Sequence, residues 1–181
     1  MKSTPPKVVL IGAPASGKSK IAKMVAAELG CKRIDTDKVI VAEHGEIVDI
    51  FRDLGEPAFR AFERAAVKDA LTHDAVISLG GGAVVDVDSQ RQLAEVHCVL
   101  LTVSEDVVAA RITDPHKRPL LKDGLAAWIA LVAQRDPIYR SLADRTFDTS
   151  HRPLEDIARE ICGWIRAGYP EESGTKGETP Q

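Results

Sequence analysis

The sequence lacks the cysteine patterns of disulfide-rich and zinc-binding proteins. Its three cysteines, Cys31, Cys98 and Cys162, are odd in number and widely separated, and they form no C-x-x-C pair. This arrangement suggests neither a disulfide framework nor a zinc cage. We expect three small core residues in a reducing compartment.

Long apolar runs are also absent. No stretch approaches the roughly 20 apolar residues that a membrane helix needs. Residues 1–7 hold two prolines and two lysines but not the apolar segment of a secretion signal. We therefore expect a cytoplasmic protein with no membrane partner.

The chain has no excess of positive charge. It carries 24 Lys and Arg residues against 27 Asp and Glu residues, which gives a formal net charge of −3. A general nucleic-acid-binding protein would show a concentrated basic face. We therefore expect no nucleic-acid partner, and any phosphate chemistry must be local.

Histidine and tryptophan offer no separate chemistry. The five histidines lie without metal-ligand spacing, and no Ser-His-Asp arrangement of a hydrolase is evident. Trp128 and Trp164 have Ala, Ile and Leu neighbours in amphipathic stretches, where packing is far commoner than a stacking role. We interpret both tryptophans as packing residues.

What remains is the composition and patterning of one α/β domain. The chain has 181 residues, of which 44% are hydrophobic and 28% charged, as in ordinary globular proteins. Hydrophobic periodicity predicts strands at 8–11, 32–34, 75–79, 96–103 and 145–148. It predicts helices at 18–29, 37–42, 47–51, 57–71, 89–94, 105–112, 125–142 and 153–166. This alternation predicts a mostly parallel sheet, with ligands at the carboxyl ends of the strands.

Two segments fall outside this alternation. Residues 113–124 are polar, contain proline and carry positive charge, so we expect a mobile surface loop over about 112–124. Residues 168–181 have almost no apolar content and are expected to form a disordered tail. The predicted domain is therefore 1–167.

The strongest motif lies between the first strand and the first helix. Residues 12–19 satisfy the pattern G-x-x-x-x-G-K-[ST] in the context that a phosphate-binding loop requires. The N–H groups of such a loop and the positive end of the helix dipole form a site for an anion. We expect Lys18 to reach the β- and γ-phosphates of a nucleoside triphosphate, and the Ser19 hydroxyl to bind Mg²⁺. The alternative is a glycine-containing turn with an exposed lysine and no ligand.

Two acids follow the second strand. Asp35 and Asp37 should project at the carboxyl edge of the sheet, close to the phosphate loop. One could join the Mg²⁺ shell, and the other could orient an attacking hydroxyl group toward the γ-phosphate. An N-cap role alone is an equal alternative, because this residue pattern is common at helix starts.

Arg60 and Glu63 lie three residues apart on one predicted helix face. Such an arginine could be held by the acid and presented to a carboxylate ligand, or the two could form only an exposed ion pair. Gly80, Gly81 and Gly82 directly follow a buried strand, which indicates a sharp turn or a close approach of a ligand to the backbone.

Together these motifs resemble the shikimate kinase family. The likeness rests on the phosphate loop, Asp35–Asp37, the segment 55–63 and the three glycines, in that order and spacing. It continues through residues 118–121 and 134–139, and so covers about residues 7–166. The resemblance implies a three-layer α-β-α fold with a five-stranded parallel sheet, of the nucleoside-monophosphate-kinase type, with a mobile lid and substrate-binding helices. It implies phosphoryl transfer from ATP to shikimate, on the route to chorismate and the aromatic amino acids, by a protein expected to be a monomer.

The resemblance also implies roles for individual residues. For the acceptor, Asp37 is expected to contact the hydroxyl groups and act as the orienting base, and the shikimate carboxylate is expected to meet Arg60, Arg135, Gly81 and Gly82, with Glu63 fixing Arg60. Lys18 and Arg118 are expected to neutralise the transferring phosphoryl group, and Ser19 and Asp35 to serve Mg²⁺. The expected ATP-binding residues are Gly12, Ala13, Pro14, Ala15, Ser16, Gly17, Lys18, Ser19, Lys20, Arg111, Arg118 and Arg152.

Three positions depart from the family pattern. Ala15 stands where a third loop glycine is usual, Lys20 where a threonine is common, and Val41 where an acid is usual. The first two put the affinity for nucleotide in doubt rather than the activity, and Val41 has no interpretation.

Two other functions remain open. A different small-molecule kinase, such as gluconate kinase, would share the phosphate loop. A nucleotide-binding regulatory module without catalysis is disfavoured because Lys18, Asp37 and Arg118 are all present.

Overall fold

The computed structural model describes residues 6–111 and 124–170. Five parallel strands form one sheet in the order β2-β3-β1-β4-β5. The strands are β1 (Val8–Ile11), β2 (Lys32–Asp35), β3 (Ala75–Ser78), β4 (Cys98–Thr102) and β5 (Arg145–Asp148). The expectation of a five-stranded parallel sheet is thus confirmed.

The helices follow the predicted alternation. They are α1 (Lys18–Leu29), α2 (Thr36–His44), α3 (Ile47–Asp53), α4 (Glu56–Ala70), α5 (Val87–Ala94), α6 (Glu105–Arg111), α7 (Gly124–Leu142) and α8 (Leu154–Arg166), with a 3₁₀ turn η1 (Ala83–Val85). Most boundaries lie within two residues of the prediction. In the described part of the chain, no helix has the length and apolar character needed to cross a bilayer.

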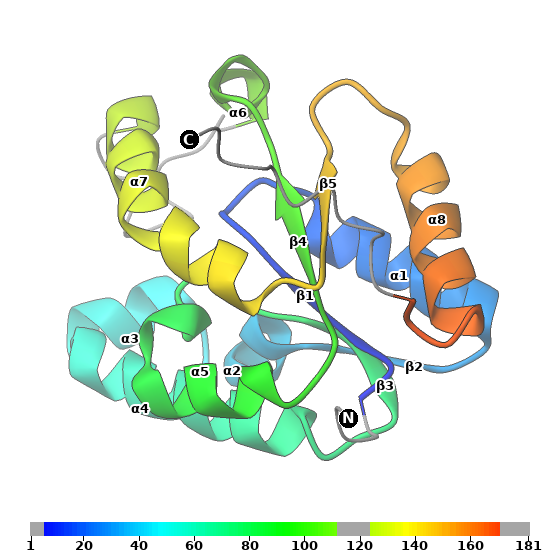
Figure 1. The fold of residues 1–181 in the computed structure, drawn as a ribbon. Coiled ribbons are helices and arrows are strands. Elements are labelled where there is room, and N and C mark those ends of the chain that lie inside the picture. Colours follow the sequence, from blue (N-terminus) through cyan, green and yellow to red (C-terminus); the bar gives the residue numbers. More distant parts are fainter. Residues whose placement is uncertain (1–5, 112–123, 171–181) are drawn as a thin grey trace, which may run out of the picture.

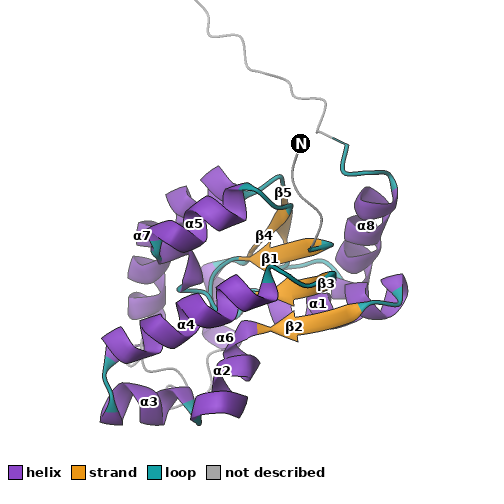
Figure 2. Ribbon diagram, turned by 90° about the horizontal axis from the view of Figure 1, so that it is seen from below, coloured by secondary structure: helices purple, strands orange, loops and turns teal. Residues whose placement is uncertain are grey.

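The sheet is the middle of three layers, because alternate residues of its strands are buried on opposite faces. On β1, Val8 and Leu10 pack with α1 and α8, whereas Val9 and Ile11 pack with α4, α5 and α7. All four β1 side chains are buried. Figures 1 and 2 show α1 and α8 on one side of the sheet and α4, α5 and α7 on the other.

The order of the strands brings three segments of the chain together at the carboxyl ends of the strands. β2, β3 and β1 are neighbours, so the loop after β1, the start of α2 and the glycines after β3 all meet at their carboxyl ends. This is where parallel α/β sheets bind ligands.

At the amino ends of the strands, the folded chain extends beyond the predicted domain boundary. The sequence predicts that the tail begins at Gly168, yet the Tyr169 ring stacks on His97 with centroids 3.8 Å apart, and its hydroxyl donates to the Lys7 carbonyl at 2.9 Å. The rest of the predicted tail, 171–181, lies outside the described residues, as does the predicted lid apart from Gly124, which begins α7.

Candidate active site

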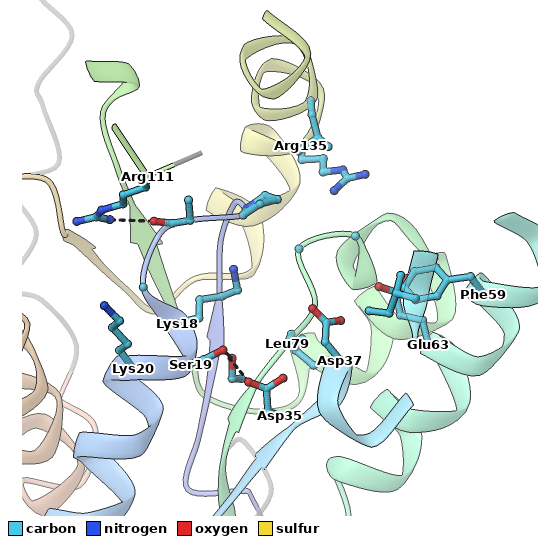
Figure 3. Close-up of a pocket in the computed structure, with 18 of the residues that line it drawn as sticks. Lys18, Ser19, Lys20, Asp35, Asp37, Phe59, Glu63, Leu79, Arg111 and Arg135 are labelled. Atoms are coloured by element: carbon cyan, nitrogen blue, oxygen red, sulfur yellow. Dashed lines mark hydrogen bonds between the residues drawn. The ribbon is translucent and has the colours of Figure 1, made fainter. Parts of the chain in front are cut away.

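A cavity of about 580 Å³ opens at the carboxyl edge of the sheet (Figure 3). Fourteen of the residues predicted from the sequence line it: Pro14, Ala15, Gly17, Lys18, Ser19, Lys20, Asp35, Asp37, Arg60, Glu63, Gly81, Gly82, Arg111 and Arg135. Gly12, Ala13, Ser16 and Arg152 do not line it, and Arg118 lies outside the described residues.

The loop after β1 has the backbone of a phosphate cradle. A Cβ atom at Gly12 would collide with the Leu101 carbonyl, and Gly17, at φ 87°, caps α1 in the left-handed region. The Lys18 side chain is buried beneath the loop, where its Nζ atom donates to the carbonyls of Gly12 at 2.9 Å and Ala13 at 2.8 Å. An ammonium group at this position lies where the anionic end of a triphosphate would need it.

Three further side chains hold the outer carbonyls of the loop. Trp128 Nε1 donates to Pro14 O at 2.9 Å, Arg111 Nη1 to Ala15 O at 2.8 Å, and Thr149 Oγ1 to Ser16 O at 3.0 Å. The bonds come from α7, α6 and the segment after β5. Three separate elements therefore fix the loop's conformation.

The two acids at the end of β2 and the start of α2 have different surroundings. Asp35 caps α2 by accepting from the Lys38 N–H at 3.3 Å, and its other oxygen accepts from the Ser19 hydroxyl at 2.6 Å. Asp37 lies in the first turn of α2 and lines the cavity. Thr36, between them, accepts a hydrogen bond from the Gly80 N–H at 3.0 Å. This bond connects the first turn of α2 to the glycine loop, residues 80–82.

Ser19 and Asp35 fit a magnesium ion by chemistry. Hydroxyl and carboxylate oxygens are the ligands that Mg²⁺ prefers, and it usually keeps several waters and phosphate oxygens as well. Among residues 6–111 and 124–170, no group of three or more His, Cys, Asp or Glu side chains could hold a metal. Two protein oxygens beside the phosphate loop suit an ion that arrives with nucleotide.

Side chains of the site pack closely on the backbone of the three glycines after β3. A Cβ atom at Gly80 would overlap Asp37 Oδ1, and one at Gly82 would overlap the Arg60 guanidinium. At Gly81 it would lie 3.1 Å from Pro14 Cδ, because the glycine loop and the phosphate loop touch. The sequence predicted a close approach here, and the structure identifies the approaching groups.

Arg60 is held by two carboxylates on its own helix. Its Nη1 atom donates to Glu63 Oε2 at 2.5 Å, and its Nη2 atom to Glu56 Oε1 at 3.0 Å. Glu63 is 3% exposed, and burial, opposed by Arg60, raises the pKa of its carboxyl group. Burial lowers the pKa of Arg60, but the two acids more than reverse this and leave it raised. The arginine is thus a fixed cation and not an exposed surface ion pair.

Arg135 approaches the cavity from α7 (Figure 3). It is 6% exposed, and within the described part of the chain its Nε atom has no hydrogen-bond partner. A guanidinium group that lines a cavity is suited to an anionic ligand. Arg60 and Arg135 therefore present two cations, from different helices, to the same cavity.

Arg111 and Arg152, both predicted to bind ATP, differ in where the structure places them. Arg111 lines the cavity beside the phosphate loop. Arg152 forms an ion pair with Glu160 and does not line the cavity, so the structure does not bring it to the site. Leu154, two residues further on, lines the cavity and packs near Gly17 instead.

Sequence reasoning missed an apolar wall and three tethering residues. The wall consists of Ile47, Phe51, Phe59, Leu79, Leu131 and Leu154. Its members fall in ordinary amphipathic patterns, which predict burial but not which buried residues face a cavity. Trp128, Tyr139 and Thr149 carry hydrogen bonds to site loops. Hydrophobic patterning does not distinguish them from packing residues, although Tyr139 lies in the segment 134–139 that resembles the family.

Comparisons with known proteins show the family of this chain. The sequence model of the family described as shikimate kinase matches residues 14–166. The shikimate kinase of Streptomyces avermitilis is 40% identical over 161 residues, which cover 87% of this chain and 94% of the relative. That of Mycobacterium tuberculosis is 39% identical over 174 residues, covering 94% and 99%.

Solved structures give the same result. The structure described as shikimate kinase from Acinetobacter baumannii in complex with shikimate matches with a TM-score of 0.85 and 28% identity, covering 91% of this chain and 95% of that one. A gluconokinase from Sinorhizobium meliloti matches with a TM-score of 0.61 and 20% identity, covering 91% and 94%. At that identity the second likeness shows a shared fold alone.

Proposed function

The chain belongs to the shikimate kinase family, and on that premise we propose that it transfers the γ-phosphoryl group of ATP to the 3-hydroxyl group of shikimate, giving shikimate 3-phosphate and ADP. One observation carries the proposal. Two guanidinium groups, Arg60 and Arg135, line the same cavity as the phosphate loop and Asp37. A small acid with a hydroxyl group is the acceptor that such a cavity fits.

The residues divide the chemistry in a way that phosphoryl transfer requires. Arg60 and Arg135 bind the carboxylate of the acceptor, and Asp37 accepts a hydrogen bond from the attacking hydroxyl group and orients it toward the γ-phosphate. Lys18 neutralises the transferring group, and we assign the same role to Arg118. Ser19 and Asp35 would hold Mg²⁺, which would supply positive charge to the phosphate groups.

The apolar wall favours a ring over a chain of hydroxyl groups. Ile47, Phe51 and Phe59 offer no polar side-chain atom to an extended polyol, whereas a carbocycle can pack against them. This argues against gluconate as the acceptor.

The cellular setting follows from the same assignment. We propose that the protein acts in the cytoplasm, as a monomer, on dissolved small-molecule substrates. The formal net charge of −3 agrees with small-molecule substrates and no nucleic-acid partner.

Release of ADP tests the proposal directly. The wild-type protein with Mg²⁺ and ATP should release ADP when shikimate is present and not when gluconate replaces it. Arg135→Ala should raise the KM for shikimate by about fiftyfold while the KM for ATP changes little, since a buried charge-assisted hydrogen bond contributes about 2–3 kcal/mol.

Arg60 and Arg64 complete the set of variants. Arg60→Lys keeps the charge that balances Glu63 but loses the planar fork, so it should also raise the KM for shikimate. Arg64→Ala is the control, because Arg64 is on the same helix, is about half exposed and does not line the cavity. Equal losses for ATP and shikimate in Arg135→Ala, or turnover with gluconate only, would overturn the assignment.

A further inference from the structure

Helix α7 donates hydrogen bonds to two site loops from one face. Trp128 Nε1 donates to Pro14 O of the phosphate loop at 2.9 Å, and the Tyr139 hydroxyl donates to Gly81 O of the glycine loop at 2.5 Å. Both side chains are buried, at 3% and 2% exposure. With about 3.6 residues per turn, positions 128, 135 and 139 share one stripe of the helix, so Arg135 lies between the two donors.

The bond from Trp128 determines which way one peptide group points. In a planar trans peptide, the C=O and N–H groups point in opposite directions. Because Trp128 holds the Pro14 carbonyl toward α7, the Ala15 N–H group points away from α7. Ala15 lines the cavity, and a phosphate-binding loop presents backbone N–H groups to its anion.

The tether adjoins the one strained residue of the loop. Ala15 has a φ angle of 69°, in the left-handed region that costs a residue with a Cβ atom roughly 1–2 kcal/mol. The Pro14 carbonyl accepts a hydrogen bond from Trp128, and the Ala15 carbonyl accepts one from Arg111. These two bonds hold alanine in a conformation that glycine would adopt without help.

We propose that Trp128 is a positioning residue for nucleotide: its indole N–H keeps the strained Pro14–Ala15 peptide in the orientation that binds phosphate. The inference rests on the proposed function only in that the loop holds the phosphates of a nucleotide. It gives a role to a tryptophan whose sequence context indicates packing.

The chain supplies a matched control for this bond. Trp164 Nε1 also donates to a proline carbonyl, that of Pro170, at 3.0 Å, and Trp164 is buried at 7% exposure. It lies at the amino ends of the strands, away from the cavity. Trp128→Phe and Trp164→Phe therefore remove the same kind of bond and keep an aromatic ring.

Calorimetric titration with Mg·ADP measures the effect without an acceptor. Trp128→Phe should weaken Mg·ADP binding about fivefold and leave the KM for shikimate within twofold of wild type, whereas Trp164→Phe should change neither. In Ala15→Gly, the loss caused by Trp128→Phe should shrink to less than twofold, because glycine needs no support in this conformation. Wild-type affinity for Mg·ADP in Trp128→Phe, or the same loss with and without Ala15→Gly, would overturn the proposal.

Two features keep the result interpretable. If Trp128→Phe does not fold, Trp164→Phe leaves Trp128 as the only tryptophan, and its emission should change during the Mg·ADP titration; constant emission would overturn the proposal. A protein that binds Mg·ADP but does not turn over shikimate would defeat the proposed function and leave this test intact.

Discussion

At the scale of single residues, the site depends on backbone positions that have no room for a side chain. Gly80 and Gly82 have ordinary φ angles, so turn geometry alone does not require glycine there. They are glycine because Asp37 and Arg60 pack onto their Cα atoms. The sequence could indicate that something approaches these glycines, but it could not say what, since the approaching groups come from other elements.

This packing predicts the effect of one added methyl group. In Gly82→Ala, the new Cβ atom would displace the Arg60 guanidinium from the glycine loop, so the KM for shikimate should rise at least tenfold while the KM for ATP stays near wild type. Steady-state kinetics with each substrate varied in turn measures the difference.

Gly163→Ala provides the control for that substitution. Gly163 lies within α8, has open space around its Cβ position, and should gain about 0.5–1 kcal/mol of stability as a helical alanine without any kinetic change. An unchanged KM for shikimate in Gly82→Ala would show that Arg60 does not need its observed position.

At the scale of elements, periodicity predicted which segments form helices and strands better than it predicted where strands end. The apolar run 96–103 was expected to be one strand, but β4 covers only Cys98–Thr102. Val96 is 4% exposed and packs in the core before pairing begins. An apolar run reports burial, and pairing depends on the neighbouring strands, which the run itself does not contain.

Helix α7 shows the same limit for function. Its pattern predicted an amphipathic helix at 125–142, within one residue of the observed start. The pattern could not distinguish the buried donors Trp128 and Tyr139 from packing residues, because their acceptors lie on loops over fifty residues away in the sequence. Arg135 was found only through a motif that resembles a family.

The raised pKa of Tyr139 predicts that the stability of the protein depends on pH. Burial raises the pKa of Tyr139 to about 12, from a usual value near 10. Because the folded-state pKa is raised, the stabilisation is fully present below pH 10 and is lost as the pH rises through about 12. Tyr139 should therefore remain a donor to Gly81 at all physiological pH values.

Comparison with Tyr139→Phe isolates this effect. Wild type should be more stable than the variant by about 1 kcal/mol at pH 8, from the hydrogen bond to Gly81. That advantage should fall by on the order of 2 kcal/mol between pH 10 and 12, as the buried hydroxyl resists ionisation. Urea unfolding of both proteins at several pH values gives the difference, and a difference that stays constant across this range would contradict the assignment.

At the scale of the whole molecule, the two ends of the parallel strands differ in function. The cavity lies at the carboxyl ends of the strands, and an aromatic cluster of His97, Trp164 and Tyr169 lies at their amino ends. Composition predicted that the fold ends at residue 167, because residues 168–181 contain almost no apolar side chains. One tyrosine is enough to extend the packed chain, and a compositional average over fourteen residues hides it.

This separation predicts that the aromatic cluster affects stability and not catalysis. Tyr169→Ala removes the stack on His97 and the hydrogen bond to Lys7, and it should lower the free energy of unfolding by about 2–3 kcal/mol. Tyr169→Phe keeps the stack and should lose only about 1 kcal/mol. Both variants should keep the wild-type KM for ATP and for shikimate, since the cluster lies at the ends of the strands away from the cavity. A change in either KM, measured below the melting temperature of the variant, would show that the two ends are coupled through the sheet.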